Sequence, residues 1–385
     1  MLHRSFCARV RLLACVAALA IVAGCAQNYL EWEDPDPHPL LIGPYVILTG
    51  RDGAIVGFRV LTSPDAEVAW KTADGKTGRV RARLNAGIYA ATLEGLPRGP
   101  VIEYDVILDG KPVTSGKFRV GTAPGETRIR FATFGDTRNG HAVHREIVTA
   151  LAREEIDFIL NTGDYVQNGG RVSEWTTFFQ IERPLLAKVP IIPTTGNHDL
   201  SGRGYYERFF FVSQVSKGRR YFATDWGNLR LIALDNGIEC NRACAQFEYV
   251  RRVLADGAAQ GKLMVMFLHH APYSSGEHGS NVGVARAIGE LAQRYGVELV
   301  IAGHDHHYER TKPIDGTTYI VSGSAGAPIR PVEPSDFTAS ARTEPHYVLI
   351  DVDGERITTR AINLRGEVFD TGVIEQNPAR VYKPR

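Results

Sequence analysis

Three histidines within four residues are the clearest chemical feature of this chain. They stand in Gly303-His304-Asp305-His306-His307, directly after the apolar run Val297–Ala302, whose composition predicts a short buried strand. Two histidines at positions i and i+2 of an extended segment point to the same side. Neutral imidazole is a good ligand for zinc, iron, nickel or manganese. We therefore expect His304 and His306 to bind metal, and His307 to point the opposite way, toward packing or solvent.

Similar polar clusters follow other apolar runs of the chain. They are Gly135-Asp136-Thr137-Arg138, Gly163-Asp164, Gly196-Asn197-His198-Asp199 and His269-His270-Ala271-Pro272-Tyr273. Glycine before a polar residue allows the backbone to turn tightly and to approach a neighbouring segment closely. In an open α/β sheet, ligands bind beyond the carboxyl ends of the strands, where such loops converge. The five clusters therefore predict a single site built from five strand ends.

The metal-binding side chains expected at this site combine hard oxygens with imidazole nitrogens. They are Asp136, Asp164, Asn197, His304, His306 and at least one histidine of the pair 269–270. This mixture suits manganese, iron, zinc or cobalt and argues against calcium. Six ligands are too many for one tetrahedral ion, whereas two ions about 3.5–4 Å apart with a bridging carboxylate fit the set. Taken singly, an Asp after a strand can instead cap a helix, and an Asn after Gly can simply tolerate positive φ.

Strands and helices alternate through the middle of the chain. Apolar runs at 129–134, 156–161, 189–193, 229–234, 263–268 and 297–302 predict strands, and periodic segments at 142–153, 173–187, 245–256 and 282–295 predict helices. Such alternation indicates an α/β layered domain, to which we assign residues 128–376. His141 and His144 begin the first helix, where we expect them to be solvated or to cap the helix rather than to bind metal.

Residues 43–122 show a different pattern. Short alternating or β-branched runs are separated by turn signals such as Asp52-Gly53 and Asp109-Gly110. This spacing predicts a small all-β sandwich that precedes the α/β domain. The segment holds few groups suited to catalysis, and Thr122–Thr127 is the expected boundary after it.

The first 24 residues have the pattern of a secretion signal. Basic residues precede the apolar run Leu12–Ala23, which is too short to span a bilayer as an ordinary transmembrane helix. The run leads into Val22-Ala23-Gly24-Cys25, which resembles a bacterial lipobox. That resemblance implies cleavage before Cys25 and lipid carried on this residue; an ordinary signal peptide cleaved nearby is the alternative. Residues 25–42 would then form a lipidated, proline-rich tether that holds the folded part at a membrane surface.

The expected location follows from the residue after Cys25. Ala26 stands there rather than Asp, which in an envelope with two membranes resembles sorting to the outer membrane. We therefore expect a bacterial cell-envelope protein, lipid-anchored at the outer membrane and facing the periplasm or the exterior. In that oxidising compartment Cys240 and Cys244 are expected to form a local disulfide. Two free thiols, or half of a zinc site, are the alternatives.

Length and charge limit the classes of function. The chain has 385 residues, of which 44% are hydrophobic, so it can bury one large core and an accessory domain. Lys and Arg total 44 against 43 Asp and Glu, and no basic stripe is visible. The composition therefore gives no indication of nucleic-acid binding.

Residues 130–325 resemble the calcineurin-like metallophosphoesterases. The resemblance lies in the order of four motifs, Gly-Asp, Gly-Asp, Gly-Asn-His and Gly-His-x-His. Gly303–Arg310 and the preceding β-rich segment are similar to purple acid phosphatases and their bacterial relatives. The resemblance implies a four-layer α/β/β/α sandwich with two metal ions at its rim, preceded by a small all-β, fibronectin-like domain.

The resemblance also implies a role for each matched residue. Asp136 and His306 would bind the first metal ion, and Asp164 would bridge the two ions. Asn197 and His304 would bind the second ion, the former through its amide oxygen.

A histidine of the fourth cluster would complete the second ion. His269 is favoured, because it precedes His278 by nine residues and relatives space a phosphate-contacting histidine similarly after this ligand. His270 is the alternative ligand. His198 would hydrogen-bond the phosphate or protonate the leaving oxygen, and His278 could share that task.

Two positions depart from the family pattern. Many metallophosphoesterases have Asp-x-His in the first cluster, and here Arg138 takes the place of that His. Purple acid phosphatases place a Tyr three residues after the second Asp, and here that residue is Gln167. The first metal ion would therefore have fewer protein ligands, or use Gln167 or water, and no tyrosinate-to-iron colour is expected. Arg138 could instead hold a non-bridging phosphate oxygen.

The function expected from these observations is hydrolysis of phosphate esters by a hydroxide ion activated at two metal ions, with iron, manganese or zinc as candidates. The partners expected are a small phosphate-ester substrate and a membrane reached through the lipid anchor. A phosphodiesterase or phospholipase-type activity is an alternative, and so is a catalytically silent, metal-containing lipoprotein that binds through its β-sandwich. The sequence does not distinguish monoesters from diesters and does not indicate an oligomeric state.

Overall fold

The computed structural model describes residues 38–200, 204–235 and 244–376. The described residues from Pro39 onward belong to one compact unit. Within these ranges, no helix is long and apolar enough to cross a membrane. The predicted signal and residues 25–37 of the predicted tether, including Cys25, lie outside the described residues, and so does Cys240. The end of that tether does not stand apart from the fold as predicted, because Leu40 and Ile42 are fully buried and Ile42 begins the strand Ile42–Leu48.

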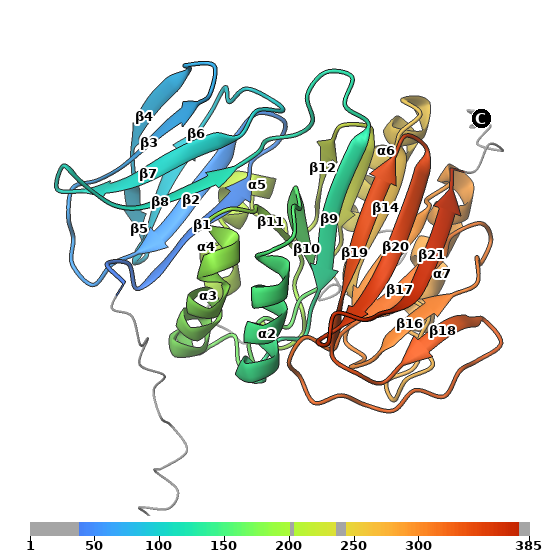
Figure 1. The fold of residues 1–385 in the computed structure, drawn as a ribbon. Coiled ribbons are helices and arrows are strands. Elements are labelled where there is room, and N and C mark those ends of the chain that lie inside the picture. The colour runs from blue at the N-terminus through green and yellow to red at the C-terminus, as the bar shows by residue number, and fades with distance from the viewer. Residues whose placement is uncertain (1–37, 201–203, 236–243, 377–385) are drawn as a thin grey trace, which may run out of the picture. The chain divides into compact units, whose positions relative to one another are not determined.

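Two large β-sheets form the centre of the fold (Figure 1). The first has ten strands in the order β21 (Val368–Glu375), β20 (Arg356–Asn363), β19 (His346–Asp353), β9 (Arg128–Phe134), β10 (Phe158–Asn161), β11 (Ile191–Pro193), β1 (Ile42–Leu48), β2 (Ala54–Arg59), β6 (Ile88–Leu93) and β5 (Arg83–Asn85). The second has seven strands in the order β12 (Phe222–Trp226), β13 (Leu229–Ala233), β14 (Leu263–His270), β15 (Leu299–Gly303), β17 (Thr318–Ser322), β16 (Tyr308–Thr311) and β18 (Thr338–Arg342).

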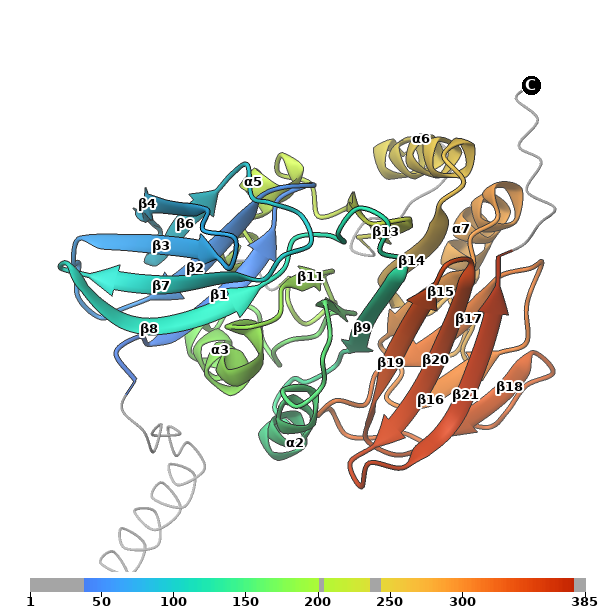
Figure 2. The same cartoon turned by 45° about the horizontal axis from the view of Figure 1, so that its top comes forward.

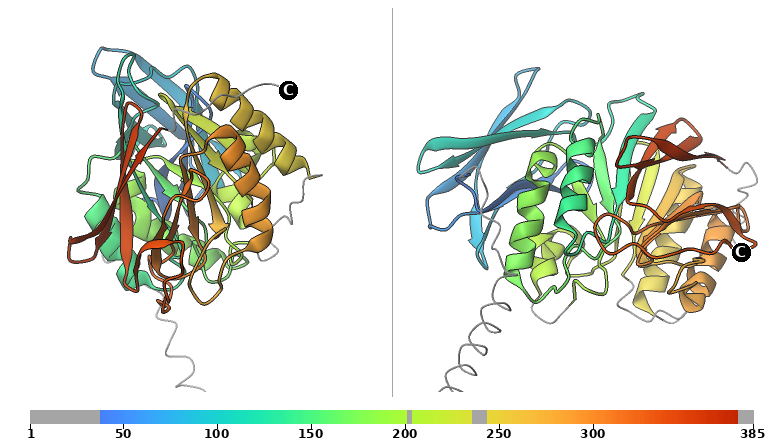
Figure 3. Two further views of the ribbon diagram at one scale, coloured as in Figure 1. Left: turned by 90° about the vertical axis from the view of Figure 1, so that its right-hand side faces the viewer. Right: turned by 60° about the horizontal axis from the view of Figure 1, so that its bottom comes forward.

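The two sheets pack face to face, and helices cover their outer faces (Figures 1 and 3). The inter-sheet core joins residues of both sheets, for example Phe131 with Val265 and Ile301. The helices are α2 (His141–Leu151), α3 (Val172–Leu186), α4 (Tyr205–Phe209) and α5 (Val212–Ser216) on the ten-stranded sheet, and α6 (Ala245–Ala259) and α7 (Val282–Tyr295) on the seven-stranded sheet. The predicted α/β/β/α layering is therefore confirmed.

The strands that carry the polar clusters are buried on both faces. In β9, Phe131 belongs to the core between the sheets, whereas its neighbour Ala132 belongs to the core under α2 and α3. β9, β10 and β11 pair in parallel, as do β13, β14, β15 and β17. Parallel strands covered on both sides are continuously apolar, which explains why their sequence shows unbroken hydrophobic runs. Their carboxyl ends all open at one edge of the fold.

The N-terminal strands form two layers, as a sandwich does, but one layer continues into the α/β part (Figure 2). β1 pairs in parallel with β11, with Ile47 opposite Ile191. A separate four-stranded sheet, in the order β4 (Thr77–Arg81), β3 (Ala66–Thr72), β7 (Ile102–Leu108) and β8 (Lys111–Phe118), packs over β1, β2 and β6. The predicted antiparallel β-domain is present, and its first sheet is shared with the α/β part.

Some elements differ from those predicted. β12, β16, β18, β21 and the short helices α4 and α5 were not expected from the sequence. His144 is also not solvated, contrary to prediction: it is 1% exposed, and its Nε2 lies 2.6 Å from Oε1 of the buried Glu182 on α3. The ring also stacks on Phe178. A buried histidine is tolerated here because a partner 38 residues away satisfies it.

Candidate metal centre

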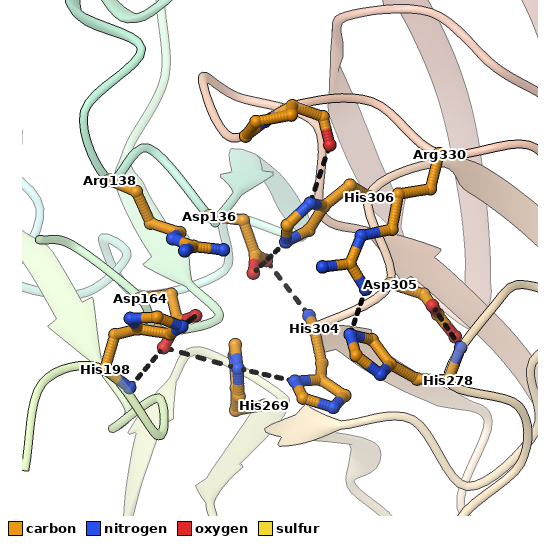
Figure 4. Close-up of polar contacts among 12 residues, drawn as sticks. Asp136, Arg138, Asp164, His198, His269, His278, His304, Asp305, His306 and Arg330 are labelled. Atoms are coloured by element: carbon orange, nitrogen blue, oxygen red, sulfur yellow. Dashed lines mark hydrogen bonds and ion pairs between the residues drawn. The ribbon is translucent and has the colours of Figure 1, made fainter. Parts of the chain in front are cut away.

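The five predicted clusters converge at the carboxyl ends of the parallel strands (Figure 4). Each expected ligand stands at or just beyond one strand: Asp136 after β9, Asp164 after β10, Asn197 after β11, His269 near the end of β14, and His304 and His306 after β15. Two sets of side chains place their ligand atoms within 4.8 Å of one another. One is Asp136, Asp164 and His269, and the other is His269, His270 and His304.

His269 turns one nitrogen, whose lone pair can bind a metal ion, toward the other expected ligands. Its Nδ1 lies 2.9 Å from the carbonyl oxygen of Thr162, so this nitrogen carries the proton and donates it. Burial lowers the pKa of His269 well below its ordinary value, so the ring is neutral and Nε2 presents a lone pair. That Nε2 lies 2.9 Å from Oδ1 of Asn197 and 3.4 Å from Oδ1 of Asp164. The lone pair of His269 thus faces two oxygen atoms, and a metal ion could bind all three ligand atoms.

The ring of His304 lies against the same group. Its Nδ1 lies 3.1 Å from Oδ1 of Asn197 and 3.2 Å from Nε2 of His269. Burial, followed by the neighbouring imidazoles, lowers the pKa of His304 to about 2. A ring that stays neutral at physiological pH is available as a ligand.

A second corner of the site is formed by Asp136 and His306. The Nδ1–H of His306 donates to the carbonyl oxygen of Pro328 at 2.7 Å, which leaves Nε2 facing Oδ1 of Asp136 at 3.6 Å. That carboxylate oxygen is buried and accepts no hydrogen bond from the described residues. Burial lowers the pKa of His306 to about 4, so this ring is also neutral near pH 7.

The carboxylates of the site are held in an unfavourable arrangement. Burial, and then the charge of Asp164, raises the pKa of Asp136 well above its ordinary value. Burial likewise raises the pKa of Asp164. Bound cations would stabilise the charged forms of these buried carboxyl groups, one oxygen of which accepts no hydrogen bond from the described residues. The donor set therefore fits metal ions, with mixed oxygen and nitrogen ligands of the kind that transition metals prefer.

Backbone strain is concentrated at these residues. Asp136, Asp164 and His304 have φ of 60°, 55° and 71°, in the left-handed region that non-glycine residues rarely adopt. The preceding glycine is required where two loops touch, because a Cβ on Gly196 would lie 2.0 Å from Oδ1 of Asp164. A Cβ on Gly303 would similarly lie 2.4 Å from Oδ2 of Asp136. The glycines of the clusters thus permit the close approach predicted from the sequence.

Comparison with known proteins shows which family the residues of this site resemble. Residues 129–308 match the sequence profile of the calcineurin-like phosphoesterases. Residues 129–308 form a calcineurin-like metallophosphoesterase domain.

Relatives of the chain are found among the purple acid phosphatases. "Purple acid phosphatase 21" of Arabidopsis thaliana is 23% identical over 344 residues, which cover 78% of this chain and 78% of that protein. "Probable inactive purple acid phosphatase 1" of the same plant is 25% identical over 45% of this chain and 35% of its own length. The match thus spans about a third of that longer relative. The structure of purple acid phosphatase PPD1 from yellow lupin seeds superposes with a TM-score of 0.76, covering 88% of this chain and 74% of that one at 18% identity.

The lupin structure supports the fold assignment, including the β-domain that precedes the metallophosphoesterase domain. The family uses binuclear metal sites, and the donor groups of this chain have the corresponding composition. The activity of this chain does not follow from this likeness, since three plant relatives are named "Probable inactive purple acid phosphatase".

Asp199 organises the loops of the metallophosphoesterase site without facing its centre. It is buried, and its carboxylate accepts three backbone N–H groups, from Asp164 at 2.9 Å, Tyr165 at 2.9 Å and Gly196 at 2.7 Å. Burial, and then the charge of Asp164, raises the pKa of Asp199, and the three N–H donors oppose that shift. Asp199 therefore fixes the second cluster against the third, as expected for a supporting residue.

His198 and Arg138 lie on the β9–β11 side of the site (Figure 4). His198 places Nδ1 2.8 Å from the backbone oxygen of Gln167, and its Nε2 lies 4.0 Å from Oδ2 of Asp164. Arg138 donates from Nε to Oε1 of Gln167 at 2.8 Å. Gln167, which stands where purple acid phosphatases have a Tyr, thus binds this guanidinium. The two departures from the family pattern are in direct contact with each other.

His278 and Arg330 lie on the opposite side of the site (Figure 4). The ring of His278 stacks on that of His304, with centroids 4.2 Å apart, and its Nε2 contacts a guanidinium nitrogen of Arg330. The backbone N–H of His278 donates to Oδ1 of Asp305 at 3.0 Å. Arg330 was not predicted, because it stands in a loop without a motif. Pro328, two residues before Arg330, accepts the hydrogen bond from His306 through its carbonyl oxygen. No sequence motif marks this role either.

The loop that carries His278 is fixed by Glu309. This buried carboxylate accepts the backbone N–H and the hydroxyl of Ser275, both at 2.7 Å, and the hydroxyl of Thr338 at 2.5 Å. His307 is fully buried, with Nε2 3.4 Å from Glu309, so it points toward packing rather than into the site. Glu309 of β16 therefore holds Ser275, in the loop that carries His278, in place.

The predicted cysteine pair is described only in part. Cys244 is disulfide-bonded and also accepts the backbone N–H of Phe247 at the start of α6. Its predicted pairing with Cys240 stays a prediction, since that residue lies outside the described ranges.

Proposed function

We propose that this chain hydrolyses phosphate esters at a pair of transition-metal ions held by the described donors. The observation that supports the proposal most directly is the convergence of the Nε2 lone pair of His269 with oxygen atoms of Asp164 and Asn197 at the ends of three strands. Asp136 and His306 would hold the first ion, Asn197, His269 and His304 the second, and Asp164 both. Bound ions would lower the pKa of a water molecule and offset charge on the phosphoryl oxygens. Iron, manganese and zinc all suit these ligands.

The side chains around the metal positions have separate tasks. Because a carbonyl oxygen fixes the Nδ1–H of His198, its Nε2 is the nitrogen that faces the site, and in the protonated state it can give a proton to the leaving alkoxide. Its backbone N–H donates to Oδ1 of Asp164, which keeps the ring close to that carboxylate. His278 presents Nε2 to Arg330, so sharing the proton donation would require a change of that contact. His198 is therefore the better candidate for the general acid.

Arg138 is proposed to bind a non-bridging phosphate oxygen. Its Nε is occupied by Gln167, which leaves the terminal nitrogens of the guanidinium for a phosphate. We expect Arg138→Ala to raise KM for nitrophenyl phosphate about 10–100-fold, as for the loss of a charged hydrogen bond of about 1.5–3 kcal/mol. Steady-state kinetics would measure it. The matched control is Arg342→Ala, which removes the side chain of an exposed arginine. Equal KM values for the two variants would show that Arg138 does not bind the substrate.

The proposal is tested by metal analysis combined with two substrates. Purified protein should contain up to about two transition-metal ions per chain and should hydrolyse nitrophenyl phosphate, bis-nitrophenyl phosphate or both. Removal of metal with a chelator should abolish turnover, and addition of manganese, zinc or iron should restore it. Full activity in the metal-free protein would refute the proposal. Metal binding without turnover on either ester would favour the catalytically silent binding function.

We further propose that the protein acts at a membrane surface through lipid on Cys25. The support is the sequence Val22-Ala23-Gly24-Cys25 after a basic and apolar leader. Cys25→Ser should move the protein from the membrane fraction to the soluble fraction, while the activity per molecule is unchanged. Retention of the variant in the membrane fraction would contradict lipid anchoring at this residue.

A further inference from the structure

Two consecutive histidines stand at the end of β14, and an irregularity in the strand changes their direction. In a regular strand, consecutive side chains point to opposite faces. β14 and β15 pair with Phe267 opposite Ile301 and then with His270 opposite Gly303, so β14 has one extra residue in this stretch. Such bulges are common beside active sites and re-aim a side chain. The bulge explains how His269 and His270 can both turn toward the same site.

The nitrogens of three histidines converge at this point. His269, His270 and His304 place one ligand nitrogen each within 4.8 Å of the others. The centroid of the His270 ring lies 4.3 Å from that of His304, and the two planes are inclined by 77°. The ring of His269 meets His304 at a similar angle of 72°. Rings that meet edge to face at these distances can direct nitrogens to a shared centre.

We propose that His270 is a third imidazole ligand of the second metal position, beside His269 and His304. The inference rests on the proposed metal pair, and it makes the two positions unequal. The second would have three nitrogens together with the oxygens of Asn197 and Asp164. The first would have one nitrogen, from His306, with the oxygens of Asp136 and Asp164, and Arg138 in place of a further histidine.

The inequality has a chemical consequence. Imidazole-rich sites bind zinc and related borderline ions more tightly than carboxylate-rich sites, which suit harder ions. The second position should therefore retain an ion such as zinc during dialysis, while the first exchanges its ion with the solution. The protein would then hold one ion tightly, and the occupancy of the other position would depend on the metal concentration in solution.

The test isolates the second position and follows metal binding rather than turnover. Asp136→Asn weakens the first position, and in this background zinc affinity is measured by competition with a chromophoric chelator. Cobalt absorption is recorded in parallel, because it reports the number of nitrogen ligands. Adding His270→Ala should weaken zinc binding by more than about 100-fold, beyond the 10–100-fold typical of residues that only support a ligand. It should also change the cobalt spectrum.

Two further variants make the result decisive. His141→Ala, added to the same background, removes a half-buried histidine outside both donor groups and should leave affinity and spectrum unchanged. His270→Gln keeps a polar side chain in case the alanine variant folds poorly, and it should show the same spectral change. The inference would be overturned if the folded His270 variants kept the cobalt spectrum of the background protein and lost less than about 100-fold in zinc affinity. Wild-type protein that binds metal and cleaves esters would in that case still support the proposed function, whereas wild-type protein that binds no metal would overturn both.

Discussion

Asp164→Asn should lower kcat for nitrophenyl phosphate at least about 1,000-fold, equivalent to about 4 kcal/mol of transition-state stabilisation. The carboxylate of Asp164 lies 3.4 Å from Nε2 of His269 and 4.0 Å from Nε2 of His198, so it stands between the second metal position and the proposed general acid. The amide has the same shape but lacks the negative charge that a bridging ligand needs. Bound metal should fall from about two ions per chain to about one or fewer.

The control for this variant is the same change at a site without function. Asp336 is exposed, and Asp336→Asn should keep wild-type kcat and metal content. Metal analysis and steady-state kinetics on both variants decide the result. If Asp164→Asn kept two ions and full turnover, the assignment of Asp164 as the bridging residue would be wrong.

Asp199→Asn should reduce both stability and metal affinity, although Asp199 faces away from the centre of the site. Its two oxygens accept three backbone N–H groups, from Asp164, Tyr165 and Gly196. In either orientation, an asparagine turns an NH2 group toward at least one of these donors. We expect the free energy of unfolding to fall by about 2–4 kcal/mol, since buried donors lose a charged acceptor. Metal affinity should fall about 10–100-fold, as when a supporting residue of a metal site is lost.

Urea unfolding and zinc competition measure the two effects separately. Unfolding should be followed in the metal-free proteins, because bound metal would itself add stability. Asp336→Asn again serves as the comparison. A variant that lost stability but kept full metal affinity would show that Asp199 supports the fold alone and does not position Asp164.

The side chains expected to bind metal could be predicted because each follows an apolar run and most stand beside a glycine. Buried parallel strands give unbroken apolar runs, and the glycine that permits close approach stands beside the polar residue it serves, as Gly196 does beside Asn197. Since parallel strands end at one edge, the order of the clusters was enough to bring Asp136 and His304 together. The layered fold followed from the same alternation of runs.

The remaining contributions have no such sequence pattern. Pro328 holds His306 through a backbone carbonyl, which every residue possesses. Glu309 and His144 are polar and buried, and their burial is tolerated only because Ser275 and Glu182, far away in sequence, satisfy them. The bulge in β14 depends on pairing with β15, so the directions of His269 and His270 could not be separated from the sequence.

The pairing of β1 with β11 limits how far the two parts of the chain can be treated as interchangeable modules. The accessory strands occupy the hydrogen-bonding edge of Ile191–Pro193, directly before the loop that carries Asn197. Without them, that edge would present unpaired backbone groups, to which strands of other chains can add. Replacing residues 129–308 without the accessory strands would therefore leave an exposed strand edge beside the proposed metal centre, so a chimera should carry both parts of the chain together.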